Sequence, residues 1–168
     1  MAIVLTGIAV VAGAALGYVN SITAPTIEAL KVQQEKEAEQ EVLNGQEGSA
    51  IKITDPKGFG GALTVMVGLA QDGTILGYKV LESSETPGLG AKAQDWFQKG
   101  QKGDIIGKQA GKLEVSKDGG EVDAITASTI TSRAFLRCIN AAYKTLSEST
   151  ADGKSGASQQ AGEPNNNI

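Results

Sequence analysis

Residues 62–81 read ALTVMVGLAQDGTILGYKVL, with two apolar runs on either side of an Asp-Gly pair. The first run, from Ala62 to Ala70, is almost continuously apolar, as expected of a buried strand. Asp72-Gly73 is typical of a tight hairpin turn, and Ile75 to Leu81 supplies the partner strand. The stretch therefore predicts a β-hairpin, the most regular element of a small domain.

Shorter elements flank this hairpin, and a longer helix follows them. Between residues 129 and 146, apolar side chains recur at three- and four-residue steps, which predicts an amphipathic helix. Cys138 is in step with them and is predicted to be a small buried hydrophobe. Strands followed by a packing helix predict an α+β fold, a small antiparallel sheet with a helix on it. The shorter predicted elements are a strand at 51–53, a helix at 91–99, and short strands at 104–106 and 113–115.

The N-terminal segment carries no charge from Met1 to Ile22 and is mostly Ala, Val, Ile, Leu and Gly. Its length suits a helix that crosses the hydrocarbon core of a bilayer. A cleavable signal peptide would have a basic beginning, whereas no Lys or Arg precedes Lys31. A buried helix of a soluble protein would need more partner surface than this chain offers. We therefore predict a transmembrane anchor at residues 1–22.

The rest of the chain divides into three predicted parts. Thr23-Ala24-Pro25 indicates a break, with Pro25 suited to the first turn of a new helix. Residues 23–48 are then a polar helical connector that ends at Asn44-Gly45. Residues 49–147 form the folded domain, and residues 148–168 are predicted to be a disordered tail because they are poor in apolar side chains.

Composition excludes several classes of function. The 168 residues have a formal net charge of -4, which argues against nucleic-acid binding. The chain has no His, and so lacks the commonest general base and transition-metal ligand. A hydrolase with a Ser or Thr nucleophile would have no evident base. We predict no metal site and no catalytic residue, and any redox chemistry would come from a cofactor.

A hydroxyl-rich segment, DAITASTITS at residues 123–132, precedes the predicted C-terminal helix. One or two of its hydroxyls could cap that helix by accepting backbone N–H groups. The segment has more hydroxyls than capping requires, however. A phosphate at the positive end of the helix, with Arg133 beside it, is the second interpretation. The residues alone leave both open.

A second motif, ETPGLG at residues 85–90, follows the hairpin. Pro87-Gly88 is a turn pair, and Gly88 and Gly90 have no Cβ to obstruct a flat ligand. Glu85 and Thr86 could bind its polar edges. An ordinary surface loop is the alternative, just as the glycine-rich stretch at residues 58–61 could be a purely structural turn.

Together these motifs resemble the FMN-binding domains of Rnf and Na⁺-pumping quinone reductase complexes, and the small size favours the Rnf G type. The ETPGLG segment is similar almost letter for letter, and the resemblance extends over most of residues 1–147. In that family FMN is joined through its phosphate to a threonine, which corresponds here to Thr129, framed by Asp123 and Thr126. The resemblance implies that Thr126 and Ser128 shape the turn around it. It also implies that the ring or ribityl side is lined by Glu85, Thr86, Gly88 and Leu89.

The segment departs from the family at two positions. Ala127 stands where glycine is usual, and Ser128 where alanine is usual. Glycine allows a positive φ that alanine resists, and Ser128 offers an alternative acceptor hydroxyl. The aromatic side chain closest in sequence to the ETPGLG loop is Trp96, a candidate to stack on the ring.

The resemblance implies a membrane-anchored electron-transfer subunit with covalent FMN in a ferredoxin:NAD⁺ oxidoreductase of the Rnf type. Its partners would be other membrane subunits of that complex, with a flavin transferase for maturation. The FMN domain would lie on the extracytoplasmic (periplasmic) side of the inner membrane, and the chain would be a redox subunit rather than a stand-alone enzyme. The alternative is a membrane-tethered binding or assembly module without flavin.

Overall fold

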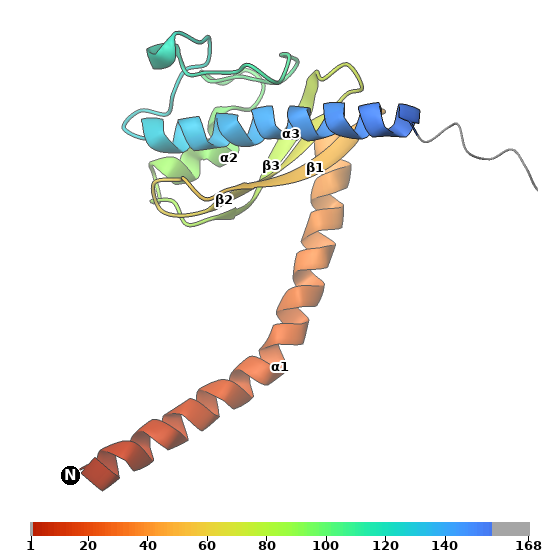
Figure 1. Ribbon diagram of the computed structural model, residues 1–168. Helices are drawn as coiled ribbons and strands as arrows, with labels where there is room; N and C mark the ends of the chain where they lie inside the picture. The colour runs from red at the N-terminus through yellow and green to blue at the C-terminus, as the bar shows by residue number, and fades with distance from the viewer. Residues whose placement is uncertain (1, 156–168) are drawn as a thin grey trace, which may run out of the picture. The chain divides into compact units, whose positions relative to one another are not determined.

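The structure is a computed structural model that describes residues 2–155. Contacts divide the chain into a helical unit that ends at Glu37 and a globular unit that begins at Ala38. The globular unit contains all the strands, and the helix α3 lies across its sheet (Figure 1).

The first helix, α1, runs without interruption from Ala2 to Leu43. Among the described residues it is the one helix long and apolar enough to cross a membrane. The predicted break at Thr23-Ala24-Pro25 is wrong, because Pro25 lies inside this helix. A proline there leaves one carbonyl of the preceding turn without its usual donor, which a long helix can accommodate at a local cost. The helix ends where predicted, at Asn44 and Gly45, which have φ values of 46° and 72°.

The sheet has three antiparallel strands in sequence order: β1 (Ser49–Asp55), β2 (Leu63–Leu69) and β3 (Ile75–Ser83). The predicted hairpin of β2 and β3 is confirmed. Its turn is held by the carboxylate of Asp72, which accepts the backbone N–H of Thr74 at 2.9 Å, and Gly73 has a φ of 86°.

The central strand β2 is buried on both faces, as its apolar run predicts. On one face Leu63, Val65, Val67 and Leu69 join the main core. On the other face Met66 packs against Ala38 and Val42 from the end of α1. The contact with Val42 is close because Gly68 of β2 and Gly77 of β3 lie opposite each other and have no Cβ. A Cβ added to Gly68 or Gly77 would lie 2.4 or 2.7 Å from the carbonyl oxygen of Val42.

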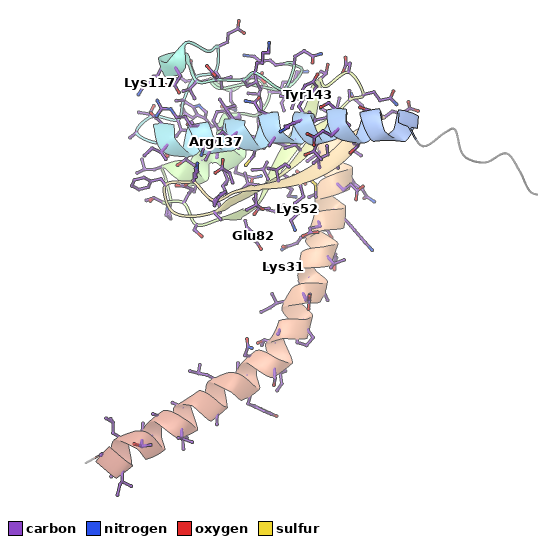
Figure 2. All side chains as sticks on the ribbon, in the orientation of Figure 1. Lys31, Lys52, Glu82, Lys117, Arg137 and Tyr143 are labelled. Atoms are coloured by element: carbon purple, nitrogen blue, oxygen red, sulfur yellow. The ribbon has the colours of Figure 1, made fainter. Side chains whose placement is uncertain are left out.

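The helix α3 (Thr129–Ser155) completes the core. The ring of Phe135 stacks on Phe97 with centroids 4.3 Å apart and meets the edge of Tyr78 at 4.7 Å. Tyr143 lies farther along α3 (Figure 2). A Cβ added to Gly73 would come within 2.2 Å of its ring. Cys138 is fully buried, as predicted, and burial raises the pKa of its thiol to about 12.

The shorter elements differ from their predictions. The helix predicted at 91–99 is a 3₁₀ turn (Gly90–Lys92) followed by α2 (Ala93–Trp96). No strand forms at 104–106, because the carboxylate of Asp104 accepts the backbone N–H groups of Gly100 and Ile106. At 113–115 a single parallel bridge joins Val115 to Val122, and the backbone of Leu113 binds the amide of Asn140 instead.

The last helix also differs in length. It begins at Thr129, as predicted, but continues to Ser155 rather than ending near Leu146. Residues 148–155 of the predicted tail are therefore helical, and residues 156–168 lie outside the described part of the chain. The segment before α3 adds one more 3₁₀ turn, η2 (Ser116–Asp118).

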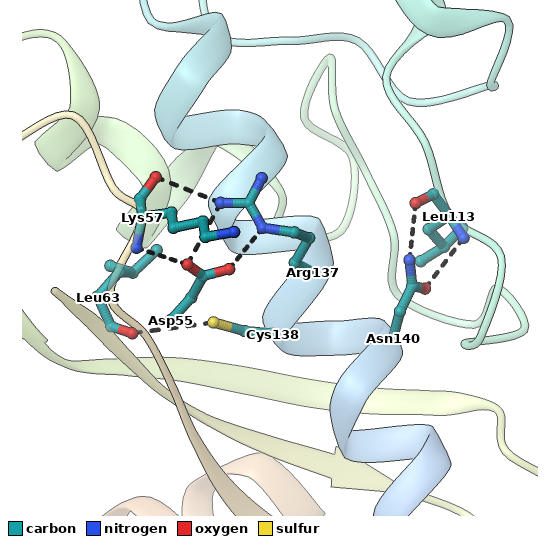
Figure 3. Close-up of polar contacts among 7 residues, drawn as sticks. All are labelled: Asp55, Lys57, Leu63, Leu113, Arg137, Cys138 and Asn140. Atoms are coloured by element: carbon teal, nitrogen blue, oxygen red, sulfur yellow. Dashed lines mark hydrogen bonds and ion pairs between the residues drawn. The ribbon is translucent and has the colours of Figure 1, made fainter.

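One ion pair ties α3 to the end of β1. Arg137 donates from Nε to the carboxylate of Asp55 at 2.6 Å and also reaches the carbonyl oxygen of Lys57 at 3.2 Å (Figure 3). Burial alone would raise the pKa of Asp55. The hydrogen bond from Arg137, the N–H of Lys57 and the charge of Arg137 together outweigh burial and hold that pKa below its ordinary value.

This ion pair predicts acid-sensitive stability. A carboxyl whose pKa is lowered in the folded state adds to the free energy of unfolding at pH values above its unfolded-state pKa, about 4. This contribution is lost as the pH falls through the folded-state pKa. We expect Asp55→Asn to lower the free energy of unfolding by about 1–3 kcal/mol at pH 7, and by less at pH 3. Urea unfolding in detergent at both pH values measures this. Asp118→Asn, at an exposed ion pair, is the control that should change little; an equal loss there would contradict the assignment.

Candidate functional site

A cavity of about 340 Å³ opens where three segments distant in sequence meet. The segments are the glycine-rich turn after β1, the ETPGLG loop after β3, and the entry to α3. The lining residues are Phe59, Glu85, Thr86, Leu89, Gly90, Ala127, Ser128, Thr129 and Ile130. The two motifs that the sequence singles out therefore form one site.

The carboxylate of Glu85 joins two of these segments through one oxygen, and its other oxygen has no described hydrogen-bond partner. Its Oε1 accepts the backbone N–H of Phe59 at 2.8 Å. Its Oε2 is buried and has no hydrogen-bond partner among the described residues. A buried acceptor without a donor is costly, so this oxygen fits a ligand that brings an N–H or O–H group into the cavity.

Glycines make this arrangement possible. A Cβ on Gly60 would lie 2.1 Å from the carbonyl oxygen of Ser84, and one on Gly90 would lie 2.4 Å from Oε2 of Glu85. The turn at residues 58–61 thus brings two backbone segments close together and also contributes Phe59 to the wall of the cavity. It is both a structural turn and a part of the candidate site.

The rim of the cavity is apolar. Phe59, Leu89 and Ile130 are 68%, 40% and 50% exposed. They are the exposed large apolar side chains of the globular unit, as far as the structure describes it, and all three line this cavity. Exposed apolar side chains gathered at a concave site are typical of ligand binding. A flat and largely apolar ring would cover them.

The hydroxyl-rich segment separates into two groups. Ser128, Thr131 and Ser132 are buried and bound to one another or to the backbone. The hydroxyls of Ser128 and Thr131 are 2.8 Å apart, while Ser132 accepts the N–H of Ile125 and donates to the carbonyl oxygen of Ser128. These three build the entry to α3.

Thr126 and Thr129 form the second group. Thr126 is exposed and does not line the cavity, whereas Thr129 lies half-buried at its wall. Its Oγ1 is 3.4 Å from Nζ of Lys117 and meets no other described hydrogen-bond partner. Among the threonine and serine residues of the segment, Thr129 is therefore the one that lines the cavity and whose described side-chain contact is only the long one to Lys117.

Most of the residues predicted to bind the ligand lie at the cavity. Glu85, Thr86, Leu89, Ser128 and Thr129 line it, and Gly88 and Thr126 do not. Gly88 serves the turn instead, with a φ of 78°. The other lining residues are Phe59, Gly90, Ala127 and Ile130. Gly90 was expected to leave room for a flat ligand, and Phe59 is an aromatic candidate to face a ring, whereas Ile130 carries no signal that separates it from a core residue.

Two other candidates have different partners. The indole of Trp96 donates to the carbonyl oxygen of Asp123 at 2.8 Å and does not line the cavity. Arg133 makes two hydrogen bonds of 2.6 Å to the carboxylate of Asp118. Trp96 therefore supports the backbone ahead of the hydroxyl segment, and Arg133 holds η2.

Ala127 lies in the left-handed region, with a φ of 60°. This conformation costs alanine about 1–2 kcal/mol. We predict that Ala127→Gly raises the free energy of unfolding by about 0.5–1 kcal/mol, after the extra freedom of glycine in the unfolded chain is subtracted. Thermal unfolding of the two proteins measures this. A lower midpoint for Ala127→Gly would show that the strain is not relieved.

Known proteins share this sequence pattern. The FMN-binding domain family matches residues 58–144. The G subunit of the ion-translocating oxidoreductase complex from Vibrio atlanticus (strain LGP32) is 35% identical over 134 residues, which are 77% of this chain and 64% of the relative. The proteins of the same name from Salmonella typhi and Escherichia coli (strain K12) are 41% and 38% identical, over 55% and 56% of this chain and 47% and 48% of theirs. The chain thus spans between about half and two thirds of the length of these relatives.

The cavity suits the ligand that this family binds. Its apolar rim fits the flat ring of FMN, the second oxygen of Glu85 fits a donor on the ring or the ribityl chain, and the hydroxyl-bearing Thr129 lies at the wall. The extent of the match and the chemistry of the cavity agree: the chain belongs to the FMN-binding domain family.

Proposed function

We propose that this chain is a membrane-anchored electron-transfer subunit of an ion-translocating oxidoreductase complex of the Rnf type, with FMN joined to Thr129. The observation that carries the proposal is the position of Thr129, at the wall of a cavity that is also lined by Glu85, whose buried Oε2 has no described hydrogen-bond partner. Relatives that bear the name of the G subunit of such a complex support the assignment of the complex.

The residues that would hold FMN have separate tasks. Phe59, Leu89 and Ile130 would cover the ring, while Glu85 would accept a hydrogen bond from its polar edge or from the ribityl chain. Thr86 lies at the same wall and would contact the polar part. FMN, when bound, supplies the exchange of electrons, and the protein supplies orientation and electrostatics.

The attachment would use the hydroxyl of Thr129. Oγ1 would take the place of the leaving group on the FMN phosphorus of a flavin donor with a phosphoanhydride bond. That P–O bond would break, and the released phosphate group would carry away the hydroxyl proton. A flavin transferase would catalyse this step. Ser128 is less suited as an acceptor, because its hydroxyl is buried and bound to Thr131.

The anchor gives a reason for a covalent link. The apolar N-terminal part of α1 would lie in the inner membrane and the FMN domain on the extracytoplasmic side, where lost FMN could not be readily replaced. The other membrane subunits of the complex would be its electron-transfer partners. A Cβ added to Gly13 or Gly17 would meet no described atom outside the helix's own backbone within 4 Å, so these glycines would permit close packing of another membrane helix on α1.

Fluorescence in a denaturing gel tests the proposal. The full chain is produced in detergent-solubilised membranes with and without a flavin transferase. A fluorescent band at the chain's position, present only with the transferase, is the expected result. A dark band under both conditions would favour the alternative, a membrane-tethered module without flavin, for which the strained Ala127 in the attachment motif is the supporting observation.

A further inference from the structure

Lys117 is the cation that the structure brings to the proposed attachment point. It belongs to η2, twelve residues before Thr129, and its Nζ lies 3.4 Å from Thr129 Oγ1. The side chain is exposed and lies beyond the N-terminal end of α3 (Figure 2). No motif pointed to this residue, and the sequence instead suggested Arg133 for the same task.

The position of Lys117 is fixed from two sides. Val115 and Val122 form a bridge across the turn, and Gly119 ends η2 with a φ of 92°. Next to Lys117, the carboxylate of Asp118 accepts hydrogen bonds from Nε and one terminal nitrogen of Arg133. These hydrogen bonds hold the pKa of Asp118 below its ordinary value. The first turn of α3 thereby holds the turn that carries the lysine.

We propose that Lys117 binds the phosphate group of the FMN attached to Thr129, and that the Asp118–Arg133 pair positions it. This inference rests on the proposed function. A phosphate joined to Oγ1 brings its anionic oxygens next to that atom, within reach of an ammonium already in hydrogen-bond distance of it. A lysine serves here as a flexible point charge, whereas the guanidinium of Arg133 is committed to Asp118.

Selective acylation of lysines tests this contact. The flavin-loaded full chain and the unloaded chain are treated briefly with a small amine-acylating reagent, and labelling at each lysine is read by peptide mass spectrometry. Lys117 should react about fivefold or more slowly in the loaded chain, because a phosphate charge about 4 Å away opposes loss of its proton. Lys112, an exposed lysine of the same segment, is the internal control and should react equally in both.

The same peptide digest distinguishes a failure of the Lys117 contact from a failure of the proposed function. If the peptide with Thr129 carries FMN but Lys117 reacts equally in both forms, the lysine contact is wrong and the proposed function stands. If no peptide carries FMN under any condition, the proposed function fails with it. The contact is also overturned if protection appears equally at Lys112.

Substitutions test the phosphate contact of Lys117 during FMN incorporation and the positioning of Lys117 by Arg133. Lys117→Gln should slow FMN incorporation by about five- to tenfold at low salt, with a smaller difference at high salt because exposed charges are screened. Lys117→Arg should recover most of the rate, and Lys112→Gln should match the parent. Arg133→Gln should weaken protection of Lys117 from acylation. A salt-independent loss, or a loss that arginine does not recover, would assign Lys117 a purely structural role and overturn the proposal.

Discussion

Thr129→Ala is expected to abolish covalent FMN completely while the chain still folds. The ester needs the hydroxyl, and alanine has none. The fold should tolerate the change because Thr129 makes its described side-chain contact with an exposed lysine, at 3.4 Å. A substitution with so few contacts usually changes the free energy of unfolding by no more than about 0.5 kcal/mol. Gel fluorescence measures the flavin, and thermal unfolding measures the fold.

Neighbouring hydroxyls supply matched controls. Thr126→Ala and Ser128→Ala should both keep the fluorescent band. Ser128→Ala should also cost about 1 kcal/mol of stability, because Thr131 loses its buried partner. If Ser128→Ala lost the flavin and Thr129→Ala kept it, the acceptor would be Ser128 and the register of the motif would be wrong.

Gly60→Ala is expected to damage both the fold and the cavity. The new Cβ would lie 2.1 Å from the carbonyl oxygen of Ser84 and 2.9 Å from Cα of Glu85, so backbone must move. Forced displacement of this kind costs about 2–3 kcal/mol. It would also separate Phe59 from Glu85, which are joined by a 2.8 Å hydrogen bond, and so open the cavity wall. Stability in urea and FMN incorporation should both fall.

Gly107→Ala distinguishes this steric effect from ordinary backbone strain. Gly107 has a φ of 83°, and nothing lies within 4 Å of an added Cβ. Its substitution should cost about 1–2 kcal/mol for the left-handed conformation and leave FMN incorporation unchanged. Equal FMN incorporation in Gly60→Ala and Gly107→Ala would contradict a role for the glycine-rich turn in shaping the cavity.

The parts of the fold that local patterns specify were predictable from sequence. The hairpin of β2 and β3, the start of α3 and the burial of Cys138 all follow from periodicity and turn chemistry. The errors arose where one side chain or a long helix overrides the local pattern. Asp104 binds the backbone at 104–106 and prevents a strand, and α1 carries Pro25 without ending.

The candidate site was predictable in its motifs but not in its geometry. The resemblance to a known family pointed to Glu85 and Thr129, yet their meeting in one cavity depends on contacts between segments far apart in the chain. The register of the motif favoured Thr129 over Ser128, and the structure adds that Ser128 is buried whereas Thr129 is half-buried. Arg133, which the sequence suggested beside the phosphate, instead binds Asp118, and Lys117 is the cation that lies near Thr129. No local pattern shows this arrangement.

Fragmentation mass spectrometry of the peptide that contains residues 123–132 tests the central claim most directly. The peptide comes from the full chain produced with the flavin transferase. We predict that it carries the added mass of FMN and that the fragments place this mass on Thr129. FMN mass on Ser128 or on another residue would contradict the assigned anchor, and an unmodified peptide from every preparation would contradict the covalent flavin itself.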